Sequence, residues 1–105
     1  MVKVTFLLPI QDNEGGNLRE LIKELEKNLY AEFGGLTKFP GHAMGKYTYR
    51  MKDGDLETEA CVMYFIAMAE EHIPKIKRLL ETFKLKAKQE SIYCEIQKNN
   101  EVLFL

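Results

Sequence analysis

His42 is the residue whose chemistry is most versatile, and it lies in the glycine-flanked loop Pro40–Gly45. Imidazole titrates near neutral pH, so beside a carboxylate or a phenol it can act as a general base or a metal ligand. Glu59 and Tyr49 are the candidate partners, on the strands expected after the loop. These three residues form the candidate catalytic set. The alternative, which we favour, is an exposed loop histidine and no catalytic residue.

Two carboxylates on one expected strand offer a second chemistry. Glu57 and Glu59 are two residues apart, where paired carboxylates could share a proton or bind a cation. We favour the simpler interpretation, in which they pair across the hairpin with Arg50 and Thr48. His72 is assigned to the start of a helix.

Two cysteines, Cys61 and Cys94, are the only thiols of the chain. They form no CxxC motif and have no histidine at zinc-ligand spacing, so we expect free thiols, no metal and no cofactor. The glycine pairs Gly15-Gly16 and Gly34-Gly35 match neither a Walker motif nor GxGxxG. We expect the first to precede a helix and the second to end it.

A basic helix is expected near the C-terminal end. Residues 72–89 hold six Lys or Arg and one Glu, whereas residues 53–71 hold six acidic and no basic residues. RNA or phosphate binding through residues 74–88 is therefore one functional alternative. Ferredoxin-like RNA readers instead use aromatic residues on central strands, and no such motif is present. We expect a solvated helix face and no nucleic-acid partner.

Length and composition limit the elements that could position these residues. The chain has 105 residues, 46% of them hydrophobic, with 15 Lys and Arg against 16 Asp and Glu. This predicts one domain over residues 1–105 and excludes a globally basic nucleic-acid protein. The apolar runs Val2–Ile10 and Val102–Leu105 are too short to span a bilayer. Without a signal-peptide cleavage site, we expect a soluble cytoplasmic protein.

Hydrophobic periodicity predicts alternating strands and helices. Asn17 is the expected N-cap of the first helix, and Asp53-Gly54 is expected to be a tight hairpin turn. The expected strands are Val2–Ile10, Lys46–Lys52, Asp55–Ala67, Ser91–Gln97 and Val102–Leu105, and the expected helices are residues 17–34 and Pro74–Lys86.

The order β-α-β-β-α-β, with an added C-terminal strand, predicts an α+β, ferredoxin-like fold. Right-handed crossovers place strands 2–10 and 55–67 in the centre of an antiparallel sheet, with strands 91–97 and 46–52 at the edges. Both helices then cover one face of the sheet. The other face has no cover within one chain.

The uncovered face is predicted to be apolar. Residues 61–66 are apolar in both alternating sets, so Val62, Tyr64 and Ile66 can face the helices while the other set faces away. Because monomeric proteins rarely expose such apolar patches to solvent, we expect a homodimer interface there. Its residues are Leu7, Cys61, Met63, Phe65 and Tyr93.

Four short segments resemble a bacterial family of uncharacterised proteins, a domain of unknown function. They are Phe33–Thr37, Gly45 with Tyr49, Gly54 with Glu59, and Gln89–Ile92. The family pattern has Gly-x-Gly-x-Trp where this chain has Tyr47 and Tyr49, and its members look exported. The resemblance implies a small α+β fold, and because the family has no known activity it adds no catalytic residue.

Together these features favour a non-enzymatic homodimeric module that binds a partner or a small ligand. One alternative is a small enzyme or ligand-binding α+β barrel with a pocket near His42, Tyr49 and Glu59. The second alternative is the RNA or phosphate binder described above.

The hairpin turn generates the first testable prediction. Gly54 should adopt a positive φ in a type I′ turn, so Gly54→Val should lower the free energy of unfolding by about 1 kcal/mol or more. Thermal denaturation measures this. An unchanged melting midpoint would mean that the turn is longer or the register different.

Overall fold

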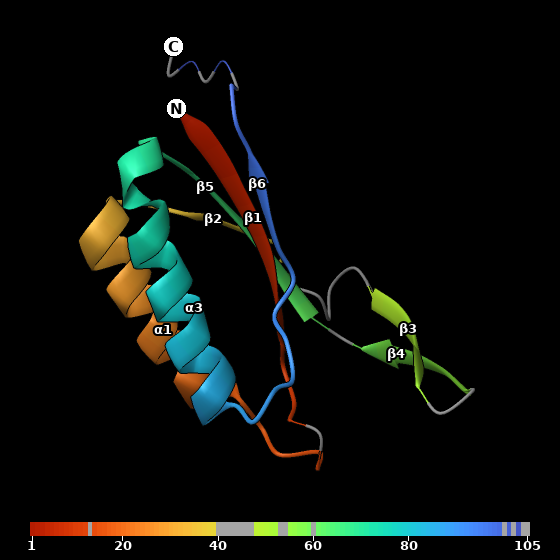
Figure 1. Ribbon diagram of the computed structural model, residues 1–105. Helices are drawn as coiled ribbons and strands as arrows, with labels where there is room; N and C mark the ends of the chain where they lie inside the picture. The colour runs from red at the N-terminus through yellow and green to blue at the C-terminus, as the bar shows by residue number, and fades with distance from the viewer. Residues whose placement is uncertain are drawn as a thin grey trace.

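The computed structural model describes residues 1–12, 14–39, 48–52, 55–59, 61–99, 101 and 103, and for 48–52 and 55–59 the backbone alone. Figure 1 shows its helices and strands. In chain order they are β1 (Val2–Pro9), α1 (Arg19–Phe33), β2 (Thr37–Phe39), β3 (Thr48–Lys52), β4 (Asp55–Glu59), β5 (Cys61–Met68), the 3-10 helix η1 (Glu70–His72), α3 (Ile73–Lys86) and β6 (Cys94–Gln97).

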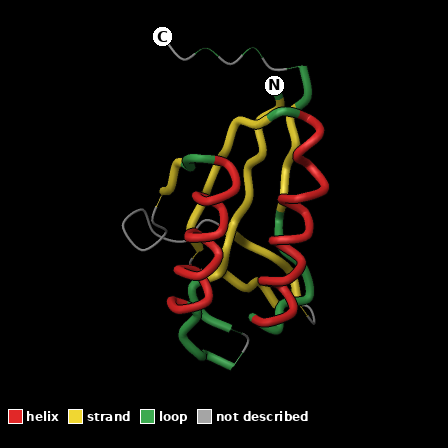
Figure 2. The backbone as a smooth tube through the Cα atoms, turned by 90° about the vertical axis from the view of Figure 1, so that its left-hand side faces the viewer, coloured by secondary structure: helices red, strands yellow, loops and turns green. Residues whose placement is uncertain are grey.

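The predicted ferredoxin-like fold is confirmed. Four antiparallel strands form a sheet in the order β2-β5-β1-β6, and α1 and α3 cover one of its faces. Figure 2, seen from the helix side, shows both helices in front of the strands. β1 and β5 occupy the two central positions, as expected from right-handed crossovers.

The edge strand differs from the prediction. The segment Lys46–Lys52 was expected at the edge beside β5, but Thr37–Phe39 is there instead. Only three residues separate α1 from β2, so the chain reaches β5 directly after the helix ends. A three-residue strand has too little alternation to be recognised in the sequence.

The hairpin β3–β4 forms a second, two-stranded sheet. Its predicted register is confirmed, because Arg50 pairs with Glu57 and Lys52 with Asp55. The turn residues Asp53 and Gly54 lie outside the described part of the chain. The expected continuous strand Asp55–Ala67 is divided into β4 and β5, so the hairpin stands apart from the sheet on the side away from the helices (Figure 1). The division falls where the sequence changes from charged alternation to apolar residues on both faces.

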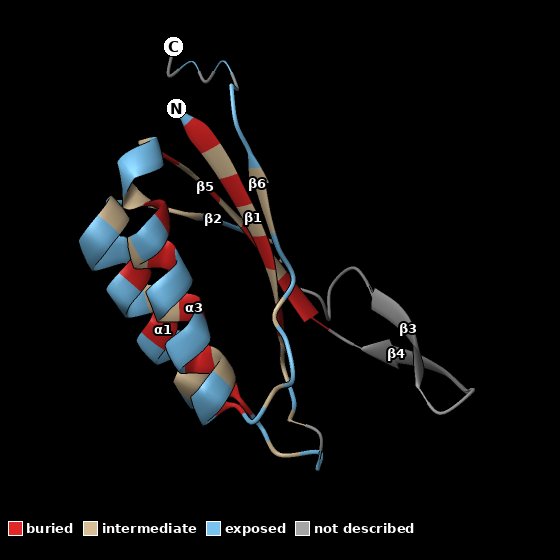
Figure 3. Cartoon of the chain, viewed as in Figure 1, coloured by how far each residue is buried: buried red, intermediate tan, exposed pale blue. Residues whose placement is uncertain are grey.

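The core lies between the sheet and the two helices (Figure 3). Alternate residues of β1 are buried, including Phe6 at 0% exposure, and the ring of Phe6 stacks on that of Tyr64 at 5.1 Å. From the helices, α1 contributes Leu29 and α3 contributes Ile76, each also 0% exposed. This burial is the main favourable contribution to folding.

The helix ends follow local signals, with one correction. Gly34 ends α1 with a left-handed φ of 79°, and its N–H donates to the Tyr30 carbonyl at 2.8 Å, as predicted. α3 begins at Ile73, directly after His72, and Pro74 lies in its first turn. Asn17 is not the N-cap, because α1 begins at Arg19; its side-chain oxygen instead accepts from the Arg19 N–H at 2.8 Å.

Fewer residues near the C-terminus form a strand than expected. β6 begins at Cys94 rather than Ser91, although the Leu7 N–H still donates to the Tyr93 carbonyl at 3.1 Å. Glu101 and Leu103 belong to no strand, and the rest of the predicted strand Val102–Leu105 lies outside the described residues.

As predicted, no disulfide joins Cys61 and Cys94, since β1 separates their strands. None of the described helices combines the length and apolarity that crossing a membrane requires.

Two leucines test the location of the core. Leu29→Ala should lower the free energy of unfolding by about 2–5 kcal/mol, because it leaves a cavity between α1 and the sheet. Leu85 is 75% exposed on α3, so Leu85→Ala should change it by less than about 0.5 kcal/mol. Urea denaturation at fixed protein concentration measures both. An equal loss of unfolding free energy in the two variants would contradict this packing.

Candidate functional site

The face of the sheet opposite the helices is the candidate site, and we call it the open face. Strand register brings its side chains together in rows across the sheet. Phe39 lies opposite Met63, which lies opposite Leu7. In the neighbouring row, Phe65 lies opposite Thr5, which lies opposite Glu95. Lys3 and Tyr93 complete the open face.

The apolar part of the open face is clustered. The rings of Phe39 and Phe65 are 5.8 Å apart at 34°, and the Lys3 Nζ lies 4.6 Å from the centroid of the Phe65 ring. An ammonium group at that distance is attracted by the aromatic face. Leu7, Phe39, Met63 and Phe65 are all half-buried, although neither helix covers this side.

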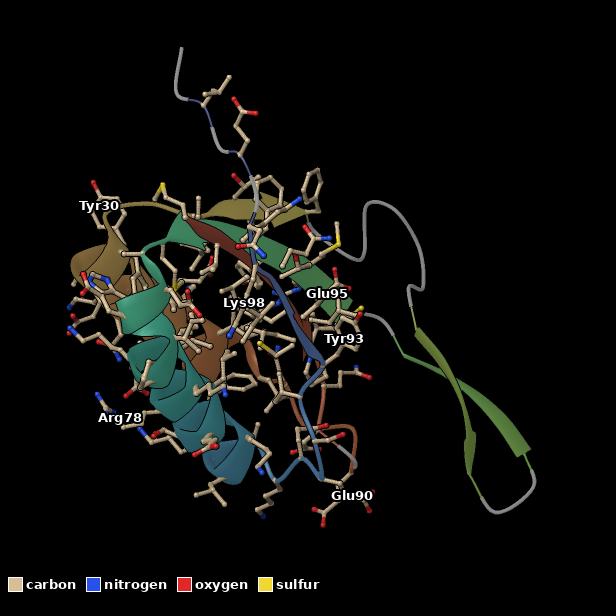
Figure 4. The ribbon with its side chains drawn as sticks, turned by 45° about the horizontal axis from the view of Figure 1, so that its top comes forward. Tyr30, Arg78, Glu90, Tyr93, Glu95 and Lys98 are labelled. Carbon is tan, nitrogen blue, oxygen red and sulfur yellow. The ribbon has the colours of Figure 1, made fainter. Side chains whose placement is uncertain are left out.

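Tyr93 and Glu95 form the polar part of the open face. The Tyr93 hydroxyl donates to the Glu95 carboxylate at 2.7 Å, and Figure 4 shows the two side chains together beside β6. This hydrogen bond, followed by the charge of Glu95, raises the pKa of the exposed Tyr93 above its usual range. The pair therefore presents a carboxylate held in position by a phenol that remains protonated at neutral pH.

A pocket of about 650 Å³ lies where the open face meets the end of α1. The sheet contributes Lys3 and Phe65, residues 33–37 form a second wall, and Glu101 and Leu103 contribute from the C-terminal segment. Small-molecule sites commonly enclose roughly 300–1,000 Å³. The pocket thus combines a suitable volume with an aromatic ring, a cation and a carboxylate.

The predicted catalytic set stays a prediction. His42 lies outside the described residues. Tyr49 and Glu59 lie on the hairpin, where Tyr49 pairs with Thr58 and Glu59 with Thr48. They therefore occupy neighbouring rather than opposing positions in the ladder.

One predicted interface residue has little accessible surface. Cys61 was expected to face outward with Met63 and Phe65, and it lies in the same alternation, opposite Pro9. It is only 2% exposed, and its place in an interface stays a prediction. Sequence reasoning missed Phe39, Lys3 and Glu95. The period-2 pattern of β1 and β6 could have placed Lys3 and Glu95 on the open face. Placing Phe39 there required recognising β2 as a strand.

The basic helix is partly neutralised within the chain. Lys75 Nζ lies 2.7 Å from Glu32 and Lys86 Nζ lies 3.0 Å from Glu24, so α1 pairs with two of the basic side chains of α3. These contacts leave less charge for a polyanion. Within the described part of the chain, no three His, Cys, Asp or Glu side chains are grouped so that they could hold a metal ion.

No family model and no curated protein matches the chain. Solved structures do resemble it. A phage SAM lyase in complex with S-methyl-5'-thioadenosine is 19% identical, with a TM-score of 0.60 over 91% of this chain and 79% of that one. CutA1 from Oryza sativa is 15% identical, with a TM-score of 0.67 over 97% and 82%.

A third similar structure is the divalent cation tolerance protein CutA1 from Thermus thermophilus. It is 15% identical, with a TM-score of 0.67 over 98% of this chain and 88% of that one. At such identities these similarities establish the fold and not the activity.

The Tyr93–Glu95 pair generates a pH prediction. Glu95→Gln should lower the pKa of Tyr93 toward its ordinary value, because a neutral amide does not oppose phenolate formation. In the unchanged protein the hydrogen bond persists below the raised pKa and is lost as pH rises through it. Phenolate absorbance, with a Tyr93→Phe variant subtracted, measures the shift.

Glu90→Gln, an exposed substitution in the loop before β6, is the matched control and should leave the titration unchanged. Identical titrations of the Glu95→Gln variant and the unchanged protein would show that the pair does not form in solution.

Proposed function

We propose that the protein is a self-associating module in which a second copy of the chain covers the open face. The observation that supports this is the aromatic and aliphatic cluster Leu7, Phe39, Met63 and Phe65 on the side of the sheet that the helices leave uncovered. Contiguous apolar patches of this kind mark interaction sites.

The sheet supplies one part of such an interface. β1 and β5 are eight residues long, β6 is four and β2 is three. With strands ~4.8 Å apart and ~3.3 Å per residue, the open face covers roughly 360 Å². That area is about half of the ~800 Å² per partner of a standard interface, so association would also draw on segments beside the sheet.

The hairpin β3–β4 supports association independently. It forms a sheet of its own on the side of the open face, and its strands pair with no other described strand. An isolated two-stranded hairpin is marginally stable in water. A second copy placed against the open face would also come within reach of this hairpin and could stabilise it.

Phe65 provides the test of self-association. Phe65→Asp should weaken association about 10- to 100-fold, because burying an unpaired carboxylate is costly and the apolar contact is lost. Phe65→Leu should retain it. Sedimentation velocity over a dilution series measures both, with Lys77→Ala on α3 as the surface control. A wild-type protein that is monomeric at every concentration would contradict the proposal.

A second candidate function is the binding of an adenosyl sulfur compound on the same face. The structure of the phage SAM lyase in complex with S-methyl-5'-thioadenosine suggests this ligand class. The Phe65 ring could stack on an aromatic base, and Glu95 could attract a sulfonium cation. Register places Phe65 and Glu95 two strands apart, roughly 10 Å, which such a ligand could span.

Calorimetric titration with S-adenosylmethionine and S-methyl-5'-thioadenosine tests this candidate. Glu95→Gln should weaken binding of the cationic S-adenosylmethionine about tenfold, and it should weaken binding of the neutral S-methyl-5'-thioadenosine less. If S-methyl-5'-thioadenosine is formed from S-adenosylmethionine, the protein is an enzyme, and His42, Tyr49 and Glu59 become the first residues to substitute. Absence of binding by both compounds would rule out this second function and leave self-association unaffected.

A further inference from the structure

β6 is an edge strand, and its outer side is open. It is the last strand on its side of the sheet and pairs with β1 alone among the described strands (Figure 1). The free edge of a sheet presents backbone N–H and C=O groups with which a further extended segment can pair. Peptide recognition by strand addition uses an edge of this kind.

The register of β6 shows which of its backbone groups point outward. The Leu7 N–H donates to the Tyr93 carbonyl at 3.1 Å, so Tyr93 is a position that bonds to β1. In an antiparallel ladder such positions alternate with positions whose N–H and C=O point away from the partner strand. The next positions of this second kind are Cys94 and Ile96, so two donors and two acceptors are aligned along the free edge.

A groove of about 520 Å³ lies beside this edge, between β6 and α3, and we call it the edge groove. Cys94 and Ile96 pair with Phe6 and Val4, which are buried against the helices, so their own side chains lie on the helix side too. Leu80, 4% exposed, lines the groove from α3. The two residues with outward backbone groups therefore also form a wall of a groove that can receive side chains.

The rim of the edge groove carries more positive than negative charge. Lys77 and Lys84 line it from α3, with Glu81 between them along the helix. Neither lysine forms an ion pair with a described residue, whereas Lys75 and Lys86 of the same helix pair with glutamates of α1. Two cations against one carboxylate favour an acidic segment over a basic one.

Lys77 also acts on the strand across the groove. Burial raises the pKa of the Cys94 thiol, and the charge of Lys77 opposes part of that increase. The ammonium group is therefore near the strand edge, where it would meet a charged side chain of an added strand.

We propose that the edge groove binds an extended acidic segment of a partner protein, which adds to the sheet as a strand beside β6. The backbone of the segment pairs with Cys94 and Ile96. Its alternate side chains enter the groove, where an apolar one packs on Leu80 and an acidic one meets Lys77. Backbone pairing supplies the affinity, and the charges supply the selectivity.

A fluorescein-labelled six-residue peptide of alternating Glu and Val is the probe, and a peptide of alternating Lys and Val is the charge control. Fluorescence anisotropy should show saturable binding of the acidic peptide and at least threefold weaker binding of the basic one. Phe65→Asp, on the open face, should leave this binding unchanged, so the test does not depend on self-association.

Cys94→Pro tests the backbone pairing. Proline removes the outward N–H at this edge position and none of the hydrogen bonds to β1, so the sheet should form as before. Binding of the acidic peptide should weaken about tenfold. Cys94→Ala keeps the N–H and should bind as the unchanged protein does. Thermal denaturation checks that both variants are folded.

Alkylation of Cys94 gives a second measurement on the unchanged chain. Cys94 is exposed and Cys61 is buried, so iodoacetamide should modify Cys94 first. A saturating concentration of the acidic peptide should slow this reaction at least fivefold, because the added strand covers the thiol. Lys77→Gln should raise the peptide concentration needed for protection about threefold. Lys75→Gln, at a lysine that does not line the edge groove, should not.

Three results would overturn the proposal. If the acidic peptide neither saturates nor protects Cys94, or if the basic peptide binds as well, the edge groove is not a site for acidic segments. If a folded Cys94→Pro variant binds as tightly as Cys94→Ala, the peptide does not add as a strand. If Cys94 is protected by raising the protein concentration without peptide, a second copy of the chain occupies the edge.

Discussion

The fold depends on β5, a central strand with apolar side chains on both of its faces. Val62, Tyr64 and Ile66 lie against the helices, where burial stabilises the chain. Met63 and Phe65 lie on the opposite side, which no helix covers. One strand thus links the stability of the monomer to the chemistry of its open face.

The same constraint explains why the open face carries polar groups only beside its apolar centre. Register places Thr5 and Glu95 on the β6 side of Phe65 and Thr37 on its β2 side, while Met63 of β5 lies opposite Phe39 in the neighbouring row. An interface with an apolar centre and a polar rim has the composition of stable protein contacts. A small ligand could share this rim, because the pocket that contains Lys3 and Phe65 lies at the end of the same face.

Local signals made much of the fold predictable. Alternation identified β1, Gly34 marked the end of α1, and the charges of residues 50–57 fixed the hairpin register. The edge strand β2 was not predictable, since three residues carry little periodic signal and their pairing with β5 is non-local. The continuous strand predicted over Asp55–Ala67 was wrong because a pattern of hydrophobicity does not show where a strand leaves one sheet for another.

The candidate sites were predictable only in part. Leu7, Met63 and Phe65 followed from strand alternation, whereas the Tyr93–Glu95 hydrogen bond required the position of two side chains in space. The Lys38–Glu26 pair beside Tyr64 joins residues twelve positions apart, and no spacing in the sequence predicts it.

Oxidation of methionine by hydroxyl radicals tests the central claim, that a second copy covers the open face, most directly. Met63 is half-buried on that face, and Met1, 57% exposed at the chain end, serves as the internal standard. We predict that Met63 is protected relative to Met1 at high protein concentration and becomes more reactive on dilution. A ratio of the two oxidation rates that stays constant at every concentration would contradict the account.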